Sequence, residues 1–372
     1  MDSKKVFTAG SLTDDLVVEI LSRVPFKSFC RFKCVSKAWL AFSSDPHYRQ
    51  KLPKIPTGFF HGGEDMSDVQ LVSLSPNDEE IDGALTFLPH HEHLEFVDCC
   101  NGLVLCKYKS SYTSLDICRF IVCNPATREW KTLPDTHPNP FGPDGSGYKA
   151  FLAFDPSCSA QFHVFNFEER SYSVKKLEVF SSDLSTWFVD DAWNSGLQIR
   201  KPHGFVNGVL YVQTLIHGTL VLEGLEAMSS GIPPHHFTIN MPQDPWSLAN
   251  GCFGQSSGIL QCAFPEDHGD TVAVLSLGTY RPNEWSLKHR LSMRDVFGRD
   301  VLVWKFGMLC LLTYAVIALD LEREVLFLFD GDSEKLLSYN INTGKHRVIQ
   351  DECVVGRSEY CYYVACYSKL PG

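Results

Sequence analysis

The sequence lacks the features that mark a secreted or membrane-spanning protein. None of its 14 cysteines stands in a C-x-x-C pair and no N-x-S/T acceptor occurs, so we expect reduced thiols rather than a disulfide framework. Lys4 and Lys5 precede no apolar run of the kind a signal peptide needs. The longest uncharged apolar stretch, residues 306–319, is shorter than the roughly 20 residues that cross a bilayer. We therefore expect a protein of the cytoplasm or nucleus with no membrane partner.

Basic residues are scarce outside the N-terminal segment. The first 56 residues hold ten of the 33 Lys and Arg and five of the 44 Asp and Glu, which gives this segment a net charge of +5 and the remainder −16. An acidic body is poorly suited to nucleic acid, because affinity for nucleic acid depends on neutralising phosphates. We expect no direct nucleic-acid partner. The basic segment favours an acidic partner, although such charges are more often a solvated helix surface.

No motif in the sequence supports catalysis or metal binding strongly. Residues 254–258 match G-x-S-x-G, but a nucleophile elbow is followed by a helix, and residues 259–264 predict a strand. The His and Cys residues between positions 90 and 100 lack the paired spacing of zinc ligands. Asp330-Gly331-Asp332 lacks the glutamate that closes a calcium loop, because residue 341 is Ile. We expect turns and strands here, no cofactor, and a binding protein rather than an enzyme.

The N-terminal segment carries helical signals. Apolar residues recur at helical spacing from Leu12 to Val24, and Thr13 and Asp14 supply capping groups at the helix start. Pro25 ends this first helix, and three further short helices are predicted before residue 55. So short a segment cannot bury all of its large apolar side chains among themselves. Either the main domain or a partner should cover the rest.

The order of residues in this segment closely resembles the F-box, especially that of plant proteins. It reads LTDDL at 12–16, EIL at 19–21, RVP at 23–25 and RFKCVSKAW at 31–39. Thr13 departs from the family, which usually has Pro there, but Thr can cap a helix start. The resemblance implies a helical bundle over residues 11–56, after a flexible segment 1–10, that docks a Skp-family adaptor and through it a cullin. The residues implied to include the docking surface are Leu12, Leu16, Ile20, Leu21, Val24, Pro25, Phe29, Phe32, Val35 and Trp39.

A second interpretation of the same residues stays open, in which all of them form intramolecular core. For Val35 and Trp39 the two interpretations are balanced. For Leu12, Leu16 and Pro25 the docking interpretation is favoured.

Beyond residue 55 the pattern changes to short apolar runs separated by turn residues, which is typical of antiparallel β-structure. Strand-turn-strand units recur over 120–133, 179–189, 274–287 and 337–349, with Trp130, Trp187, Trp285 and His346 in their second strands. The interval between Trp187 and Trp285 is the widest and leaves room for a further unit near 220–232. A possible unit over 71–88 brings the number of units to six. Such spacing indicates propeller blades. The predicted fold is mainly β with a small α-helical N-terminal domain: an F-box bundle, then a six-bladed β-propeller over 57–370 whose ring is closed by the strand at 360–367.

The propeller region carries a second, looser resemblance. Residues 99–103 (CCNGL), 123–127 (CNPAT) and Trp130 resemble the F-box-associated domain of plant F-box proteins, which is kelch-like. Together the resemblances imply a non-catalytic substrate-recognition subunit of a Skp–cullin–F-box ubiquitin ligase, whose propeller binds an unidentified target protein. Loop aromatics at Phe141, Trp193 and Trp246 are candidate target contacts, although loop residues of this kind more often serve only as turns. An F-box scaffold outside ubiquitination and, less favoured, a kelch-like propeller enzyme are the alternatives.

Overall fold

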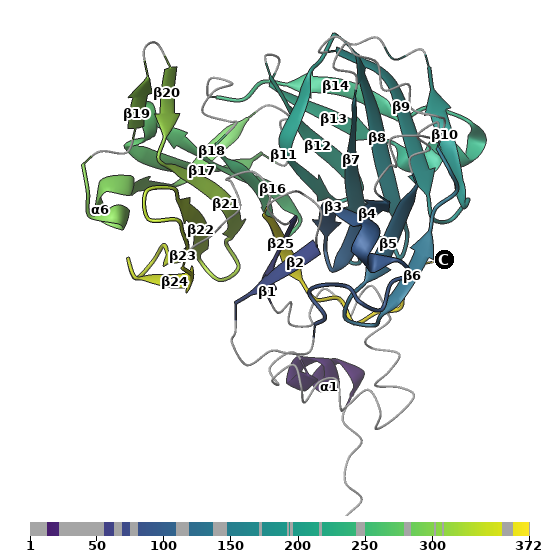
Figure 1. Cartoon of the computed structure of the whole chain (residues 1–372), viewed down its shortest axis with the longest axis horizontal. Coiled ribbons are helices and arrows are strands. Elements are labelled where there is room, and N and C mark those ends of the chain that lie inside the picture. Colours follow the sequence, from purple (N-terminus) through teal and green to yellow (C-terminus); the bar gives the residue numbers. More distant parts are fainter. Residues whose placement is uncertain are drawn as a thin grey trace, which may run out of the picture. The chain divides into compact units, whose positions relative to one another are not determined.

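The chain divides into two compact units, Met1–Ile55 and Pro56–Gly372. The structure, a computed structural model, describes residues 13–21, 56–62, 69–74, 81–108, 119–136, 147–170, 173–191, 193, 196–215, 218–242, 250–278, 284–300, 303–306, 309–351 and 360–371 (Figure 1). In the first unit these residues form helix α1 (Asp14–Leu21), at the position predicted for the first helix. The other helices predicted for the N-terminal bundle lie outside the described residues.

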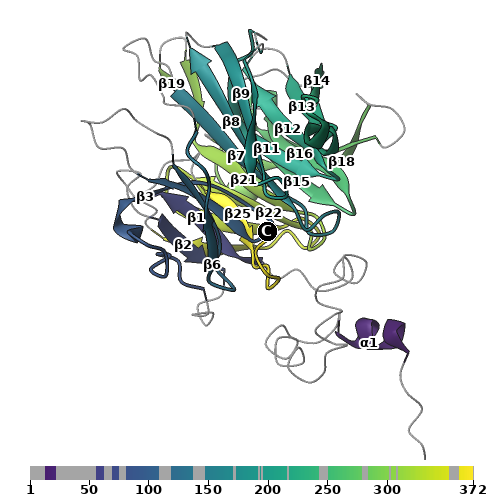
Figure 2. The same ribbon diagram turned by 90° about the vertical axis from the view of Figure 1, so that its right-hand side faces the viewer.

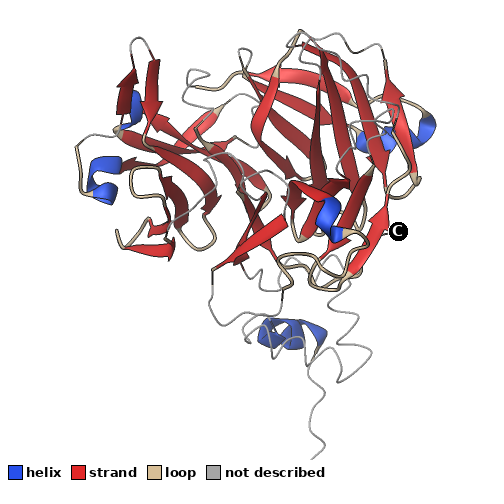
Figure 3. Ribbon diagram, in the orientation of Figure 1, coloured by secondary structure: helices blue, strands red, loops and turns tan. Residues whose placement is uncertain are grey.

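The described residues of the second unit lie mostly in strands, and its described helices are short (Figure 3). Its described residues form one three-stranded sheet, five four-stranded sheets and a two-stranded hairpin. We call the six larger sheets blades 1 to 6 in chain order. Blade 1 contains β2 (Val69–Ser73), β1 (Pro56–Gly62) and β25 (Cys361–Val364).

Blades 2 to 6 each consist of four strands that follow one another along the chain. Blade 2 contains β3 (Leu94–Cys100), β4 (Leu103–Tyr108), β5 (Phe120–Asn124) and β6 (Glu129–Thr132). Blade 3 contains β7 (Gly147–Phe154), β8 (Phe162–Arg170), β9 (Ser173–Ser181) and β10 (Thr186–Asp190). Blade 4 contains β11 (Ile199–Val206), β12 (Val209–Thr214), β13 (Thr219–Glu223) and β14 (His235–Ile239).

Blade 5 contains β15 (Cys252–Ser256), β16 (Ile259–Glu266), β17 (Thr271–Leu277) and β18 (Trp285–Ser292). Blade 6 contains β21 (Tyr314–Asp320), β22 (Val325–Asp330), β23 (Lys335–Asn340) and β24 (His346–Gln350). The extra hairpin contains β19 (Val303–Phe306) and β20 (Leu309–Leu312). The described helices of this unit are η1 (His91–His93), η2 (Leu225–Ser230), η3 (Asp267–Gly269) and α6 (Met293–Phe297).

The blades form a closed ring. Strand β3 contacts β7, β7 contacts β11, β11 contacts β15, β15 contacts β21, β21 contacts β25, and β25 contacts β3 again. These six strands are therefore the inner strands of a six-bladed β-propeller, as the sequence predicted. Strand β25 completes blade 1 by pairing antiparallel with β1, with Cys361 opposite Phe60, so the predicted closing strand is confirmed. Figures 1 and 2 show β25, in yellow, beside β1.

The hydrophobic core is divided among the interfaces between neighbouring blades. Among the described residues, five clusters of buried side chains each fill the space between two neighbouring blades. A sixth cluster lies on blade 5, and Met241, which follows blade 4, packs against it. A blade that packs on both faces needs apolar residues on both faces of its strands. This explains why the strands read as short continuous apolar runs: all five residues of β5, sequence FIVCN, are buried.

The Asn-Gly pairs form tight turns, because both residues accept positive φ at low cost, and also connect blades. Asn101 and Gly102 have φ of 46° and 91°, and Asn207 and Gly208 have φ of 51° and 80°, as a turn with two left-handed residues requires. The Asn101 amide donates to the Phe154 carbonyl of blade 3 at 2.6 Å. The Asn207 amide donates to the Gly258 carbonyl of blade 5, also at 2.6 Å. Each turn thus ties its blade to the next.

Two predicted units differ from the structure. The unit expected over residues 71–88 is only partly a hairpin: β2 ends at Ser73, and residues 81–88 form turns that bury Leu85 and Leu88 in the core between blades 1 and 2. The unit expected over 220–232 is interrupted by η2, so its second strand, β14, begins only at His235. In both places apolar residues that cover a blade lie in turns or a 3-10 helix instead of a strand.

Candidate functional site

Helix α1 leaves apolar side chains uncovered. Asp14 and Asp15 open the helix, where negative charge suits the positive end of the helix dipole. Leu16 and Ile20 lie one turn apart on the same side of the helix and are 52% and 50% exposed, whereas Val17 is 7% exposed. Two large aliphatic side chains that remain half in water on one helix side form a surface suited to a partner.

The other residues predicted to dock the adaptor are not tested by the structure. Leu21 belongs to α1, but its side chain lies outside the description. The remaining predicted docking residues also lie outside the described residues: Leu12, Val24, Pro25, Phe29, Phe32, Val35 and Trp39.

Among the predicted target contacts, Trp193 does not lie on the surface. Trp193 is 3% exposed and belongs to the core between blades 3 and 4. Its ring packs edge-on against Phe167 at 6.0 Å and stacks on His236 at 4.1 Å between ring centroids. Trp193, between β10 and β11, fills part of the space between these two blades. Phe141 and Trp246 lie outside the described residues.

The tryptophans that marked the repeat have a structural role that the sequence did not reveal. The Trp187 indole N–H donates to the Pro134 carbonyl of blade 2 at 2.9 Å, and the Trp285 indole N–H donates to the Asn240 carbonyl after blade 4 at 3.2 Å. Each ring reaches back to the chain that leaves the preceding blade. Trp130, at the matching place in blade 2, is 44% exposed. It is therefore the aromatic side chain on the described propeller surface best placed to contact a partner.

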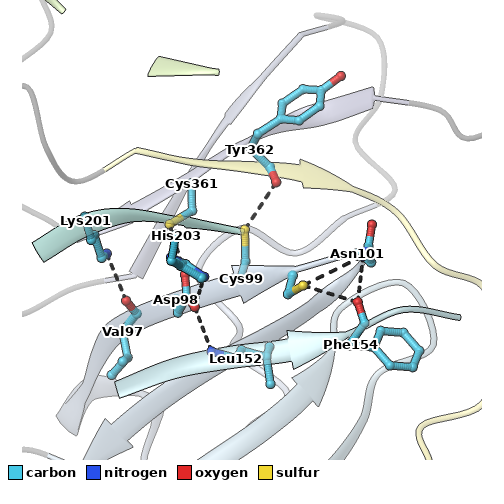
Figure 4. A network of polar contacts seen from close by, with 11 residues as sticks. Val97, Asp98, Cys99, Asn101, Leu152, Phe154, Lys201, His203, Cys361 and Tyr362 are labelled. Carbon is cyan, nitrogen blue, oxygen red and sulfur yellow. Dashed lines mark hydrogen bonds and ion pairs between the residues drawn. The ribbon is translucent and has the colours of Figure 1, made fainter. Parts of the chain in front are cut away.

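A buried polar network lies where four inner strands meet (Figure 4). The carboxylate of Asp98, on β3, accepts from His203 of β11 at 2.9 Å and from the backbone N–H of Leu152 of β7 at 2.7 Å. The thiol of Cys361, on β25, lies 3.5 Å from the other Asp98 oxygen. Burial by itself would raise the pKa of Asp98, but His203, Lys201 and the Leu152 N–H together outweigh burial and hold the pKa below its ordinary value of 3.8.

Two of these four strands, β3 and β11, carry irregularities at the same level. The pairing of β3 shifts between Phe96 and Asp98, and the pairing of β11 shifts between Arg200 and His203. Bulges re-aim side chains, and here they direct Asp98 and His203 toward each other. Lys201, within the β11 bulge, donates to the Val97 carbonyl at 3.2 Å and strengthens the link between the two strands. Because these residues come from distant parts of the chain, sequence spacing gave no signal for the network.

The G-x-S-x-G segment and the Asp330-Gly331-Asp332 segment form the strands and turns that were predicted for them. Ser256 ends β15 and pairs with Ile259 of β16, so the G-x-S-x-G segment is a hairpin turn. Asp330 ends β22 and forms a two-point ion pair with Arg299, at 2.8 and 2.6 Å. Within the part of the chain that the structure describes, no three His, Cys, Asp or Glu side chains are arranged to hold a metal ion. None of the described helices is long and apolar enough to span a membrane.

Comparison with known proteins agrees with the N-terminal pattern. Residues 10–51 match the F-box domain. The chain is 30% identical over 205 residues to the F-box protein At5g07610 of Arabidopsis thaliana, covering 49% of this chain and 47% of that relative, so this match spans about half of the relative's length. It is 28% identical over 319 residues to the F-box protein At5g49610 of Arabidopsis thaliana, covering 80% of this chain and 83% of that relative.

Among solved structures, a protein from Lactobacillus plantarum superposes with a TM-score of 0.45 at 11% identity, covering 80% of this chain and 82% of that chain. The chain thus has an F-box domain near its N-terminus, plant F-box proteins as relatives, and a six-bladed β-propeller.

Proposed function

We propose that this protein is the target-recognition subunit of a Skp–cullin–F-box ubiquitin ligase and has no catalytic activity of its own. The observation that carries the proposal is the order of the two parts, an F-box match over residues 10–51 followed by a six-bladed propeller. A plant relative named as an F-box protein aligns with 80% of this chain. In this arrangement the F-box would dock a Skp-family adaptor, and through it a cullin, while the propeller, proposed to be kelch-like, holds an unidentified target protein.

The exposed side of α1 supports the docking step. Leu16 and Ile20 are half exposed in the free chain. Covering the exposed half of one such side chain stabilises a complex by about 1 kcal/mol. We propose that these two residues and the other predicted docking residues of segment 12–39 contact the adaptor. The net positive charge of the first 56 residues favours an acidic partner surface.

The propeller would act by position. A closed ring of blades is rigid, and a rigid body that holds a target near a ubiquitin-charged enzyme raises the effective concentration of the reacting groups. Phe141 and Trp246 remain proposed target contacts, and we add Trp130 because its ring is exposed. Aromatic side chains of this kind contribute much of the energy at interface centres.

The docking step is tested with the full-length protein and a purified plant Skp-family adaptor. The double substitution Leu16→Ala and Ile20→Ala removes the exposed aliphatic groups without touching Val17, which is buried. We expect the affinity for the adaptor to fall on the order of tenfold or more, because about 2 kcal/mol of apolar burial is lost. Isothermal titration calorimetry measures the affinity.

Leu287→Ala is the matched control. Leu287, on β18, is the same residue type and is 51% exposed, close to the 52% of Leu16, but it belongs to the propeller. The control variant should bind the adaptor like the unchanged protein. An unchanged affinity in the double variant, with both variants folded, would contradict the docking assignment.

The role in ubiquitination is tested separately in cells. Candidate targets are proteins that copurify under proteasome inhibition and whose ubiquitinated forms require residues 1–56. Target half-life should lengthen when that segment is deleted. If copurified proteins keep the same half-life, the scaffold alternative outside ubiquitination replaces the ligase role.

A further inference from the structure

Two cysteines from distant parts of the propeller sequence meet where the ring closes. Cys99 lies on β3 of blade 2, and Cys361 lies on β25 of blade 1. The Cys99 sulfur lies 3.4 Å from the Tyr362 carbonyl oxygen, and the Cys361 sulfur lies 3.5 Å from Asp98 Oδ1 (Figure 4). Each cysteine sulfur is therefore hydrogen-bonded to the residue next to the other cysteine. Both thiols are free, and the two strands that carry them, β25 and β3, contact each other.

The surrounding structure holds this pair in place. Asp98, next to Cys99, is fixed by His203 at 2.9 Å and by the Leu152 N–H at 2.7 Å. Tyr362, next to Cys361, donates its hydroxyl to Asp320 at 2.8 Å and packs against Phe59, with 5.5 Å between ring centroids. Each strand is thus anchored at a residue next to its cysteine, which keeps the two thiols near each other without a covalent bond.

We propose that Cys99 and Cys361 are a modification site, at which a hydroperoxide converts the two thiols to a reversible disulfide that fastens β25 to β3. Cys361 is the more exposed of the two and reacts first. Its sulfur attacks one peroxide oxygen, the O–O bond breaks, and the thiol proton leaves with the other oxygen as water or an alcohol. This leaves a sulfenic acid on Cys361.

The second step closes the disulfide. The Cys99 sulfur attacks the sulfenic sulfur, the S–S bond forms, the S–O bond breaks, and the hydroxyl leaves with the Cys99 proton as water. Two thiols and one hydroperoxide are consumed in total. Burial raises the pKa of Cys99 well above its ordinary value, so proximity to the sulfenic acid, and not thiolate content, drives this step.

The consequence concerns closure of the ring. Strand β25 is four residues long and supplies the inner strand of blade 1 through hydrogen bonds to β1. A disulfide to β3 would hold it covalently against blade 2. Because the bond joins positions far apart in the sequence, it restricts the unfolded chain strongly. We therefore expect the oxidised propeller to melt at a higher temperature. This inference does not depend on the role of the F-box.

The test uses the full-length protein, reduced and then treated with hydrogen peroxide. Free thiols are alkylated, the protein is digested without reduction, and peptides are identified by mass spectrometry. We expect a cross-linked peptide pair containing Cys99 and Cys361, lighter by two hydrogens than the separate thiol peptides. The melting temperature should rise on the order of 5 °C and return to its starting value with dithiothreitol.

Cys100→Ser is the matched control for Cys99→Ser. Cys100 is the next residue on β3, but its sulfur donates to the Phe154 carbonyl of blade 3 at 3.3 Å and does not face β25. The Cys100 variant should keep the cross-link and the reversible thermal shift, and the Cys99 variant should lose both. The wild-type peptide map decides the question even if a variant folds poorly. Recovery of Cys99 and Cys361 as free thiols, as separately oxidised residues or in other disulfides would overturn the proposal.

Discussion

Helix α1 and the propeller differ in how far their apolar side chains are exposed. In α1, two of the three aliphatic side chains that the structure describes, Leu16 and Ile20, are half exposed. In the propeller, the large aromatic side chains Phe59, Phe151 and Phe264 are at most 1% exposed. A blade in a closed ring has a neighbour on each face and can bury both. A short helix has fewer neighbours of its own. The difference indicates that the N-terminal unit has an apolar surface suited to a partner, whereas the blades of the propeller bury one another's apolar side chains.

The comparison is tested most strongly by a change inside the propeller core. Phe59, on β1, packs at 5.0 Å from Phe327 of blade 6, centroid to centroid, and fills the interface between blades 6 and 1. Phe59→Ala should lower the free energy of unfolding by about 3–5 kcal/mol, because it leaves a cavity that rigid blades cannot close. Urea denaturation followed by tryptophan fluorescence measures the change.

Leu287→Ala, on the exposed side of β18, is the control for this prediction. It should change the free energy of unfolding by less than about 0.5 kcal/mol. Similar losses in the two variants would break the comparison, because the blade interfaces would then not be the source of propeller stability.

A smaller effect is expected for the buried carboxylate of Asp98. Asp98→Asn weakens the bond to His203, and loss of a charge-assisted hydrogen bond costs about 2 kcal/mol near pH 6. The pKa of Asp98 is below 3.8 in the folded protein. Its carboxylate therefore stabilises the fold at pH values above 3.8, and this contribution is lost as the pH falls through the lowered pKa.

The difference in stability between wild type and Asp98→Asn should accordingly shrink between pH 5 and pH 2. Thermal unfolding of both proteins across this range measures it. A difference that grows toward low pH would show that the Asp98 carboxylate does not stabilise the closed ring.

The smallest effect separates two tryptophans at matching places in neighbouring blades. Trp187→Phe removes the hydrogen bond to the Pro134 carbonyl and should cost about 1 kcal/mol of stability. Trp130→Phe should cost less, because the Trp130 side chain is 44% exposed. Chemical denaturation compares the two variants. Equal losses would mean that the reach of Trp187 to the preceding blade adds nothing, and that Trp130 is held as firmly as Trp187.

The sequence predicted the parts of this structure that depend on local pattern. Short apolar runs, turn residues and spaced tryptophans predicted six blades. The apolar segment at 360–367 predicted the closure of the ring. The Asn-Gly turns likewise follow from the two residues themselves. On the N-terminal side, the spacing of Leu16 and Ile20 predicted a helix with an apolar side.

The parts that depend on contacts between distant residues were not predictable. The position of Trp193 in the core follows from a gap between blades 3 and 4 that only the fold creates. Blade 1 combines strands from both ends of the propeller, so the unit expected at 71–88 was only partly right. Asp98 and His203 meet because their strands are both inner strands, with bulges at the same level. The spacing of residues along the chain does not predict the contact between Asp98 and His203.

The central claim is that the exposed side of α1 is covered by an adaptor. Hydrogen–deuterium exchange of the full-length protein, alone and with a purified plant Skp-family adaptor, measures it directly. We predict slower exchange in α1 and elsewhere within residues 10–51 when the adaptor is present, and no change in the blades. Exchange in α1 that stays the same at saturating adaptor, or protection that falls only on the blades, would contradict the account.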